Sequence, residues 1–394
     1  MQPRVTITTS WNDPDAVSHY ATGVSLHGHT SFSEETLDFV HSACAWIPGL
    51  RPVLAHYERI SRDRHGIQLN FERANWRPPL QPRMAYELEA RQISSLWLTP
   101  LVSLTDHDSM DAPLLLRTLP SARHIPMSTE WSVPFGKTVF HLGIHNVPSR
   151  KASAWMQRMA SFTAAANEAR RNNAPHAHLD CELLAMLREL HEIDQVLLVL
   201  NHPAWDLHKV GETLHMSETV RFLSLAKNTI HALELNGLRH AQENRKIGLL
   251  ARELGYLVIS GGDRHGLEAN ANVNLSSASS FTEFVEEIRI DRVSHVHFMP
   301  QYREPWEQRI VASTLDAVTD FPQFMPGWQR WDERVFHPDS NGVMRPVSEL
   351  WPQGQAPLGL RAAISFVRLG KMRAMCAPIR LAFPGVNQLE FESL

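Results

Sequence analysis

Short apolar runs alternate with longer helical patterns over the first 300 residues, and this alternation is the strongest constraint on the fold. The predicted strands are residues 22–27, 98–105, 124–130, 137–144, 196–201, 231–236, 256–261 and 293–298. The predicted helices are residues 34–47, 83–96, 151–171, 180–191, 217–227, 240–254 and 280–289. Strands separated by helices favour an α/β fold built on a largely parallel sheet.

Two segments break this pattern. Residues 49–82 form a polar, Arg-rich insertion after the first strand, and we expect either a lid over the site or a surface excursion. From residue 301 the alternation stops, which predicts a main domain over 1–300 and a helical, loop-rich appendage over 301–394. Its segment 358–383 is apolar with interspersed arginines and predicts an amphipathic helix. We expect this helix to pack on the main domain or on a second subunit, so the chain can form a homo-oligomer.

Composition narrows the class of protein. Hydrophobic residues make up 43% of the 394 residues, and no apolar run approaches the roughly 20 residues that span a bilayer. The N-terminus has no basic start followed by an apolar segment, so we expect a cytoplasmic protein. Cys44, Cys181 and Cys376 are too far apart for a zinc ribbon or a disulfide framework. A net charge of −4 predicts no stable binding of nucleic acid.

Histidines and carboxylates recur where the predicted strands end, in a chain that contains 22 histidines. His27 and His29 follow the first strand two residues apart, so their side chains point to the same side of extended backbone. The next strand ends in the sequence TDHD, which contains Asp106 and His107. The later strands carry the candidates Glu130, His141, His145, His202, Asp263 and His265.

This recurrence predicts a metal centre. The carboxyl ends of parallel strands meet on one face of an α/β barrel, and ionisable groups gathered there are costly to bury unless they bind a cation. Imidazole and carboxylate ligands without a thiolate suit Zn, Mn or Fe. A carboxylate such as Glu130 can bridge two ions, and closely spaced ions favour hydrolysis of a phosphoester.

The motif series strengthens this interpretation. HxHTxxSEE, TDHD, TEWS, FHLG, NHP, ELN and GGDRH follow one another between about residues 24 and 266. This series resembles that of the PHP (polymerase and histidinol phosphatase) superfamily. The resemblance implies a distorted (β/α)7 barrel related to the amidohydrolases, two or three bound divalent metal ions, and hydrolysis of a phosphoester by a hydroxide generated on a metal.

The resemblance also implies a role for each motif residue. His27, His29, Glu130 and Asp263 would hold one ion, and Glu130, His141 and His202 a second. Glu34, His107 and His265 would hold a third, with Asp106 as an orienting group or an additional ligand. His145 is a rival to His141, whose surroundings FHLG match better. Two departures stand out: Glu34 and Glu35 replace the family's Asp-Gly, and Gly262 replaces its serine.

The expected substrate is a small phosphorylated metabolite or a nucleotide. A phosphate monoester carries about two negative charges, so we expect a cation at the site. Arg239 and Arg264 are the candidates, and Lys137 is a weaker one. Two other functions stay open at this point. One is a metal-dependent amidohydrolase that cleaves C–N bonds, although no lysine stands out for carboxylation. The other is a non-catalytic scaffold that the metals stabilise and whose tail binds a partner.

Overall fold

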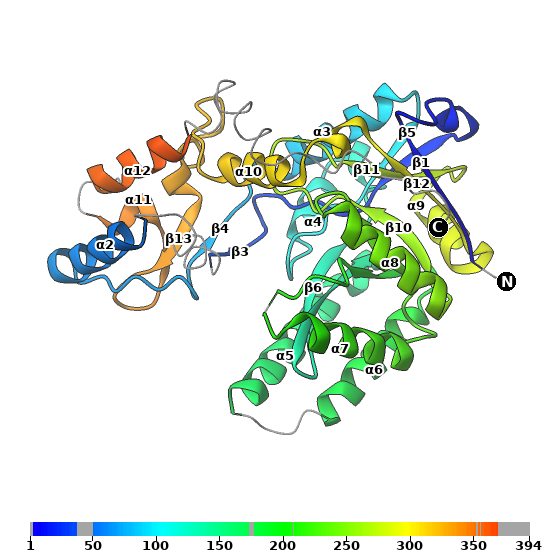
Figure 1. Cartoon of the computed structure of the whole chain (residues 1–394), viewed down its shortest axis with the longest axis horizontal. Coiled ribbons are helices and arrows are strands. Elements are labelled where there is room, and N and C mark those ends of the chain that lie inside the picture. Colours follow the sequence, from blue (N-terminus) through cyan, green and yellow to red (C-terminus); the bar gives the residue numbers. More distant parts are fainter. Residues whose placement is uncertain are drawn as a thin grey trace.

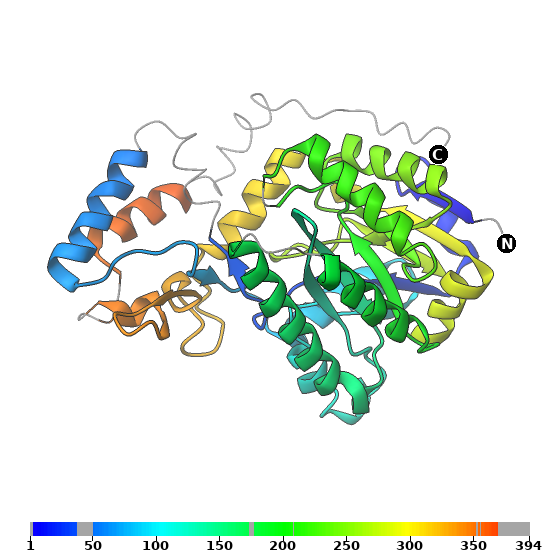
Figure 2. The ribbon, with the colours of Figure 1, turned by 90° about the horizontal axis from the view of Figure 1, so that it is seen from below.

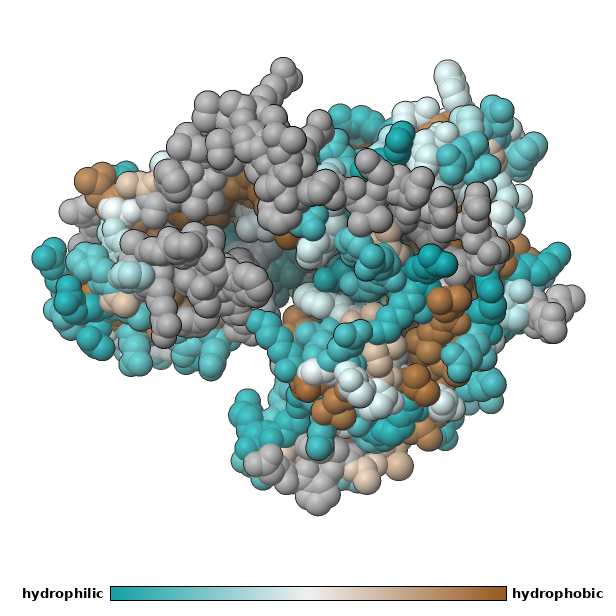
Figure 3. Space-filling view, in the orientation of Figure 1, coloured by the Kyte–Doolittle hydropathy of each residue, from teal (hydrophilic) through white to brown (hydrophobic). Residues whose placement is uncertain are grey.

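The computed structural model has two parts, a larger α/β body and a smaller lobe (Figure 1). It describes residues 3–37, 50–172, 177–207, 209–351, 354 and 356–368. A second view, turned by 90°, shows the lobe as a separate mass at one end of the long axis (Figure 2). Hydrophilic residues cover most of the described surface in Figure 3. In the described part of the chain, no helix has both the length and the apolar character needed to cross a membrane.

Two five-stranded sheets form the larger body. The first has the order β1 (Arg4–Thr9), β12 (Val293–Phe298), β11 (Asn272–Ser276), β2 (Thr22–Ser25), β5 (Thr99–Val102). The second has the order β10 (Leu257–Gly261), β9 (Ala232–Asn236), β8 (Leu197–Asn201), β7 (Thr138–His145), β6 (Thr129–Phe135). Both sheets are mixed, because β11 runs antiparallel to β12 and β2, and β7 runs antiparallel to β6 and β8.

The prediction of a (β/α)7 barrel is wrong. No continuous ladder of backbone hydrogen bonds closes the described strands into a barrel. Between β10 and β11, hydrogen bonds from side chains replace backbone pairing. There the Asn274 side chain accepts a hydrogen bond from the Ser260 amide (2.8 Å) and donates one to the Ser260 carbonyl (3.3 Å). Two isolated bridges, Gly28 with Arg264 and His107 with Glu130, also connect the two halves of the body. Gly28 and His107 follow strands of the first sheet, while Glu130 lies in the second sheet and Arg264 follows it. Between β6 and β7 a tight turn at Gly136 (φ 52°) replaces the helix that a βα unit would have.

Most predicted strands are present, and the misses have physical reasons. The predicted strand 124–130 is displaced, since β6 continues to Phe135 despite Pro134, which an edge strand tolerates. The sequence missed β11 because asparagine is rare in strands. Asn272 and Asn274 instead use their side-chain amides to bind backbone of neighbouring strands.

Helices cover the second sheet and the ends of the first. They are α3 (Pro82–Ser95), α4 (Asp111–Leu116), α5 (Ser149–Arg171), α6 (Ala177–His191), α7 (Glu212–Leu225), α8 (Ala241–Leu254), α9 (Phe281–Glu286) and α10 (Trp306–Ala317). Short helical turns are η1 (Ala16–His19), η2 (Pro120–Ala122), η3 (Glu287–Asp291) and η4 (Pro300–Arg303). The main core contains Trp131, Leu142, Trp155, Leu187, Phe222, Leu233 and Ile247, from β6, β7, β9 and α5 to α8.

Six of the seven predicted helices are found, each with at least one end shifted. The helices α5, α6 and α8 end at the predicted residue, and Gly255, which caps α8, has the left-handed conformation. The predicted helix 34–47 is wrong where the structure describes it, because Glu35–Thr36 is strand β3. Residues 38–47 of that prediction, including Cys44, lie outside the described residues, as does Cys376. Cys181 is exposed and free.

The smaller lobe combines the insertion with the tail. Its sheet has the order β14 (Met344–Pro346), β13 (Val335–Pro338), β4 (Asn75–Trp76), β3 (Glu35–Thr36). Its helices are α2 (Leu50–His65), η5 (Trp331–Glu333), α11 (Val347–Leu350) and α12 (Leu358–Arg368). Its core joins Ile67 of the insertion to Trp331, Val347, Leu350, Trp351 and Ala356 of the tail. The tail therefore packs against the insertion, which the sequence did not suggest.

The buried histidine of β12 predicts a loss of stability in acid. Burial lowers the pKa of His297 to about 4, against an upward pull from Asp13. Between pH 6.5 and 4 the unfolded chain takes up a proton that the folded chain does not, so the unfolding free energy falls as the pH falls. His297→Gln should keep about 3 kcal/mol more of its stability than the wild type over this range, as measured by urea unfolding. The exposed His178→Gln serves as control, and equal pH slopes for all three proteins would contradict the prediction.

Candidate metal centre

The predicted ligands converge on one side of the larger body, most of them just after strands of the two sheets, and Glu130 and His141 within β6 and β7. His27 and His29 follow β2, and His107 follows β5. Glu130 lies in β6 and His141 in β7, while His202 follows β8. Asp263 and His265 follow β10. All of these residues are buried except His107 and His265, which are partly exposed.

Glu130 lies at the centre of this cluster and is fully buried. Its Oε2 atom is 3.1 Å from Nε2 of His27, 3.3 Å from Nε2 of His29 and 3.3 Å from Nδ1 of His107. Despite these close nitrogens, Oε2 of Glu130 and Nδ1 of His107 have no hydrogen-bond partner. A buried carboxylate oxygen without a hydrogen bond is costly, and a shared cation would satisfy it.

The other oxygen of Glu130 contacts a second set of side chains. Oε1 is 3.4 Å from Nδ1 of His141 and 3.1 Å from Nε2 of His202. The Asn201 amide donates a hydrogen bond to the same oxygen (2.9 Å). The two oxygens of one carboxylate thus contact different histidines, as a bridging ligand between two ions would.

Three groups of side chains have ligand atoms close enough to hold an ion. They are His27, His29, Glu130 and Asp263; then His107, Glu130 and His141; and finally His29, Glu35, His107 and His265. The first group has the composition that the motif resemblance implies. The second group contains His107, and His202 lies beside it, with its Nε2 3.3 Å from Nδ1 of His141. The donors fit Zn, Mn or Fe.

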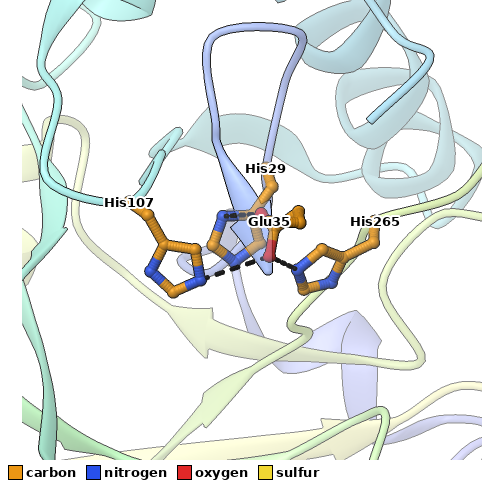
Figure 4. A group of neighbouring side chains, drawn as sticks. All are labelled: His29, Glu35, His107 and His265. Carbon is orange, nitrogen blue, oxygen red and sulfur yellow. Dashed lines mark ion pairs between the residues drawn. The ribbon is translucent and has the colours of Figure 1, made fainter. Parts of the chain in front are cut away.

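The third group contains Glu35 and not the expected Glu34 (Figure 4). Oε2 of Glu35 is 3.1 Å from Nε2 of His265 and 3.4 Å from Nε2 of His107. Glu34 is half-exposed and pairs with Arg77, its Oε1 2.7 Å from the guanidinium. Adjacent side chains in extended backbone point to opposite sides, so only one of the two glutamates can face the histidines.

The charges of the cluster favour a cation. Burial alone would raise the pKa of Glu130, but His27, His141 and His107 lower it well below its usual range. His265, His107 and His29 lower the pKa of Glu35 in the same way, again against burial. Both carboxylates are therefore ionised at neutral pH and can serve as ligands.

Glu234 of β9 is a positioning residue that the sequence analysis did not identify. Its Oε1 is 2.6 Å from Nδ1 of His27, and its Oε2 accepts a hydrogen bond from the His202 amide (2.8 Å). A carboxylate at the outer nitrogen of a metal-binding histidine fixes the ring and its tautomer. A Cβ atom at Gly261 would lie 1.6 Å from this carboxylate, so the first glycine of GGDRH provides its space. The sequence did contain a signal for Glu234, because this residue is the first polar residue of the ELN motif.

The second glycine of GGDRH also leaves space for a neighbouring side chain. A Cβ atom at Gly262 would lie 1.8 Å from the Asn270 side chain, which binds the carbonyl of His27 through its amide (3.0 Å). Asn270 thus occupies the space that a serine at position 262 would need. The backbone here is strained as well, since Asp263 has φ 54° and His202 has φ 29°.

Asp106 and Arg264 hold the loops of the site and belong to none of the three groups. Asp106 accepts hydrogen bonds from the amide (2.5 Å) and hydroxyl (2.8 Å) of Thr30, next to His29. The Arg264 guanidinium is buried and donates to Glu89 (2.9 Å) and to the carbonyl of His29 (2.8 Å). The guanidinium of Arg264, a candidate for binding the substrate, is therefore engaged by Glu89 and by the backbone that follows β2.

Arg239 lies beside the cluster. Its guanidinium stacks 3.8 Å from the ring centroid of Trp205, whose ring packs at 4.9 Å on that of His202. Its buried Nε atom has no hydrogen-bond partner and lies 4.0 Å from Oε1 of Glu243, with which it forms an ion pair. A small pocket next to this stacked pair is lined by His141, His202 and Trp205, among others. Arg239 is thus placed near a space that adjoins the ligands.

The two weaker candidates lie elsewhere. Lys137 is in the turn between β6 and β7, at the opposite end of β6 from Glu130. His145 is outside the three groups, its Nδ1 2.9 Å from the Ser103 hydroxyl, and burial lowers its pKa to about 3. The preference for His141 over His145 agrees with these positions.

Comparisons with known proteins identify no family. No protein-family model and no curated protein matches the chain. Among solved structures, an amidohydrolase from Chromobacterium violaceum matches with TM-score 0.34 and 18% identity, over 49% of this chain and 86% of that one. PsfC from Pseudomonas syringae matches with TM-score 0.40 and 12% identity, over 75% and 96%. A protein named "putative metal-dependent phosphoesterase" from Bifidobacterium adolescentis matches with TM-score 0.30 and 14% identity, over 55% and 92%. These likenesses are too low to support an argument about function.

Proposed function

We propose that this chain is a metal-dependent phosphoesterase that acts on a small phosphorylated metabolite or a nucleotide. The observation that carries the proposal is the buried Glu130 carboxylate, whose two oxygens contact five histidines. The ordered motif series, which resembles that of the PHP superfamily, supports phosphoester hydrolysis in particular.

In this proposal His27, His29, Glu130 and Asp263 would hold one ion, Glu130, His141 and His202 a second, and Glu35, His107 and His265 a third. His29 and His107 each belong to two of the groups, and a neutral imidazole binds one ion, so each would serve one ion alone. When bound, such ions polarise a phosphoryl oxygen and lower the pKa of water. Glu234 keeps the His27 ring in place, and Asp106 does the same for the loop after His29. Arg239 supplies a positive charge beside the ligands, where it would bind an oxygen of the substrate's phosphate.

The test is an assay of phosphate release with Mn or Zn on a panel of phosphomonoesters and nucleotides. Wild type should hydrolyse at least one of them, and His29→Ala and Asp263→Ala should lose at least 10³-fold in kcat/KM, about 4 kcal/mol. His178→Ala is the matched control, because this histidine is exposed on α6 and far from the cluster in sequence. Hydrolysis of amide substrates alone would replace the proposal by C–N hydrolysis. A metal-bound protein inert towards both panels would favour the scaffold alternative.

A further inference from the structure

The third group differs from the other two in where its carboxylate comes from. His29, His107 and His265 follow strands of the two large sheets, as do the ligands of the other groups. Glu35 instead belongs to β3, the edge strand of the lobe sheet. The side chains in Figure 4 show Glu35 reaching the three histidines from this separate element.

A short ladder links Glu35 to the tail of the chain. Glu35 pairs with Trp76 of β4, and Trp76 pairs in turn with Val335 of β13. The carbonyl of Arg334 also accepts a hydrogen bond from the Arg77 amide (2.9 Å). Glu35 is therefore held in register by residues that follow it by 300 positions.

The side chain of Arg77, which we call the brace, contacts residues on both sides of the same ladder. Its guanidinium pairs with Glu34 at 2.7 Å, directly before Glu35, and lies 4.5 Å from the ring centroid of Phe336 in β13. One side chain thus connects the strand of the ligand to the strand of the tail. A charged pair of this kind fixes geometry more than it adds stability, because it is partly exposed.

The lobe also touches the histidines of the group. The Trp76 ring lies 6.0 Å from the ring of His265, centroid to centroid. The buried Ser33 hydroxyl donates to Oε1 of Glu35 (2.6 Å) and accepts a hydrogen bond from the His107 amide (3.1 Å). The third group therefore lies at the junction between the lobe and the larger body.

We infer that the lobe completes the third metal site, with β13 and Arg77 acting as positioning elements for Glu35. An ion at Glu35, His107 and His265 then depends on the lobe, whereas the ions at Glu130, held with His27, His29 and Asp263 or with His141 and His202, do not. The inference rests on the proposed metal centre and deepens it. If the inference holds, binding of the third ion can change while the other two ions stay bound. A displacement of the lobe would remove the Glu35 ligand and leave the ligands around Glu130 in place.

The test compares two arginines of the lobe. Arg77→Ala removes the contacts of this side chain with Glu34 and Phe336, while Arg73→Ala is the matched control, since Arg73 is exposed and its guanidinium donates to the carbonyl of Gly342. Ions per chain are counted by elemental analysis, and Mn affinities are measured by calorimetric titration. Thermal melting of the metal-free proteins shows whether each variant is folded.

Wild type and Arg73→Ala should bind three ions. Arg77→Ala should bind two with unchanged affinity and the third at least tenfold more weakly, and Arg77→Lys, which keeps a cation between Glu34 and Phe336, should recover the third. Glu35→Gln should lose the third ion and keep two. If Arg77→Ala does not fold, Phe336→Leu, which removes the ring contact and keeps an apolar side chain, should show the same selective loss.

The inference is overturned if the folded brace variants bind the third ion as the wild type does. It is equally overturned if wild type and Glu35→Gln bind the same number of ions. A wild type that binds three ions, loses one in Arg77→Ala and hydrolyses no phosphoester would support the inference and refute the proposed function. The two claims can thus fail separately.

Discussion

Glu130→Gln is expected to reduce metal binding from three ions to one and to lower phosphoester hydrolysis by at least 10³-fold, about 4 kcal/mol in the barrier. The two groups that share Glu130 would lose their common negative charge, and a glutamine nitrogen would take the place of one ligand oxygen. The group around Glu35 contains no atom of Glu130, so its ion should stay. Elemental analysis and steady-state kinetics measure both effects.

The matched control is Glu168→Gln on α5, where the carboxylate is exposed and outside the cluster. The shape of glutamine is that of glutamate, so the fold should be preserved, and circular dichroism checks this. A Glu130→Gln protein that still binds three ions would show that the central carboxylate does not bridge ions.

Removal of metal is expected to destabilise the chain strongly. Ionised carboxylates and several histidines are buried together here, and ions that bind only the folded state stabilise it by RT ln(1 + [L]/Kd). At 1,000-fold excess over Kd this is about 4 kcal/mol for each ion. Two or three ions would then raise the melting temperature by roughly 10 °C or more in a chain of this size.

Thermal unfolding with excess chelator, with Mn and with Zn measures this difference. Mg and Ca prefer oxygen ligands and should stabilise less than Mn or Zn at equal concentration. The rise in melting temperature on adding Mn or Zn should be smaller in Glu130→Gln than in the wild type. The difference should equal the part that the two lost ions contribute. Equal melting temperatures with chelator and with Mn or Zn would rule out a metal centre in this cluster.

Most residues of the candidate site could be predicted from the sequence. His27, His29, Glu130, His141, His202, Asp263 and His265 stand at or near the ends of apolar runs that do form strands. Strand ends that share a face bring such residues together, and a separation of two residues puts His27 and His29 on one side. The local pattern was sufficient here because each ligand is fixed by its own strand.

The choice between neighbouring residues could not be made in this way. Glu34 and Glu35 have the same chemistry, and only the pairing of β3 with β4 decides which one faces His265. Arg264 lies between two ligands in sequence, yet its guanidinium donates a hydrogen bond to the buried Glu89 of α3. Glu234 acts through His27, a contact that exists only after β2 and β9 are brought together.

The sequence by itself determined most strands and helices of the larger body, although not β1 and β11, and most of the residues that gather in the cluster, because periodicity and position along a strand are local properties. The tertiary structure decided the rest. Between β10 and β11, asparagine side chains take the place of a backbone ladder, so the two sheets do not close into a barrel. The insertion and the tail, each too small to bury its own apolar side chains, share one core around Ile67 and Trp331. That pairing places Glu35, and contacts between such distant segments leave no periodic signal in either one.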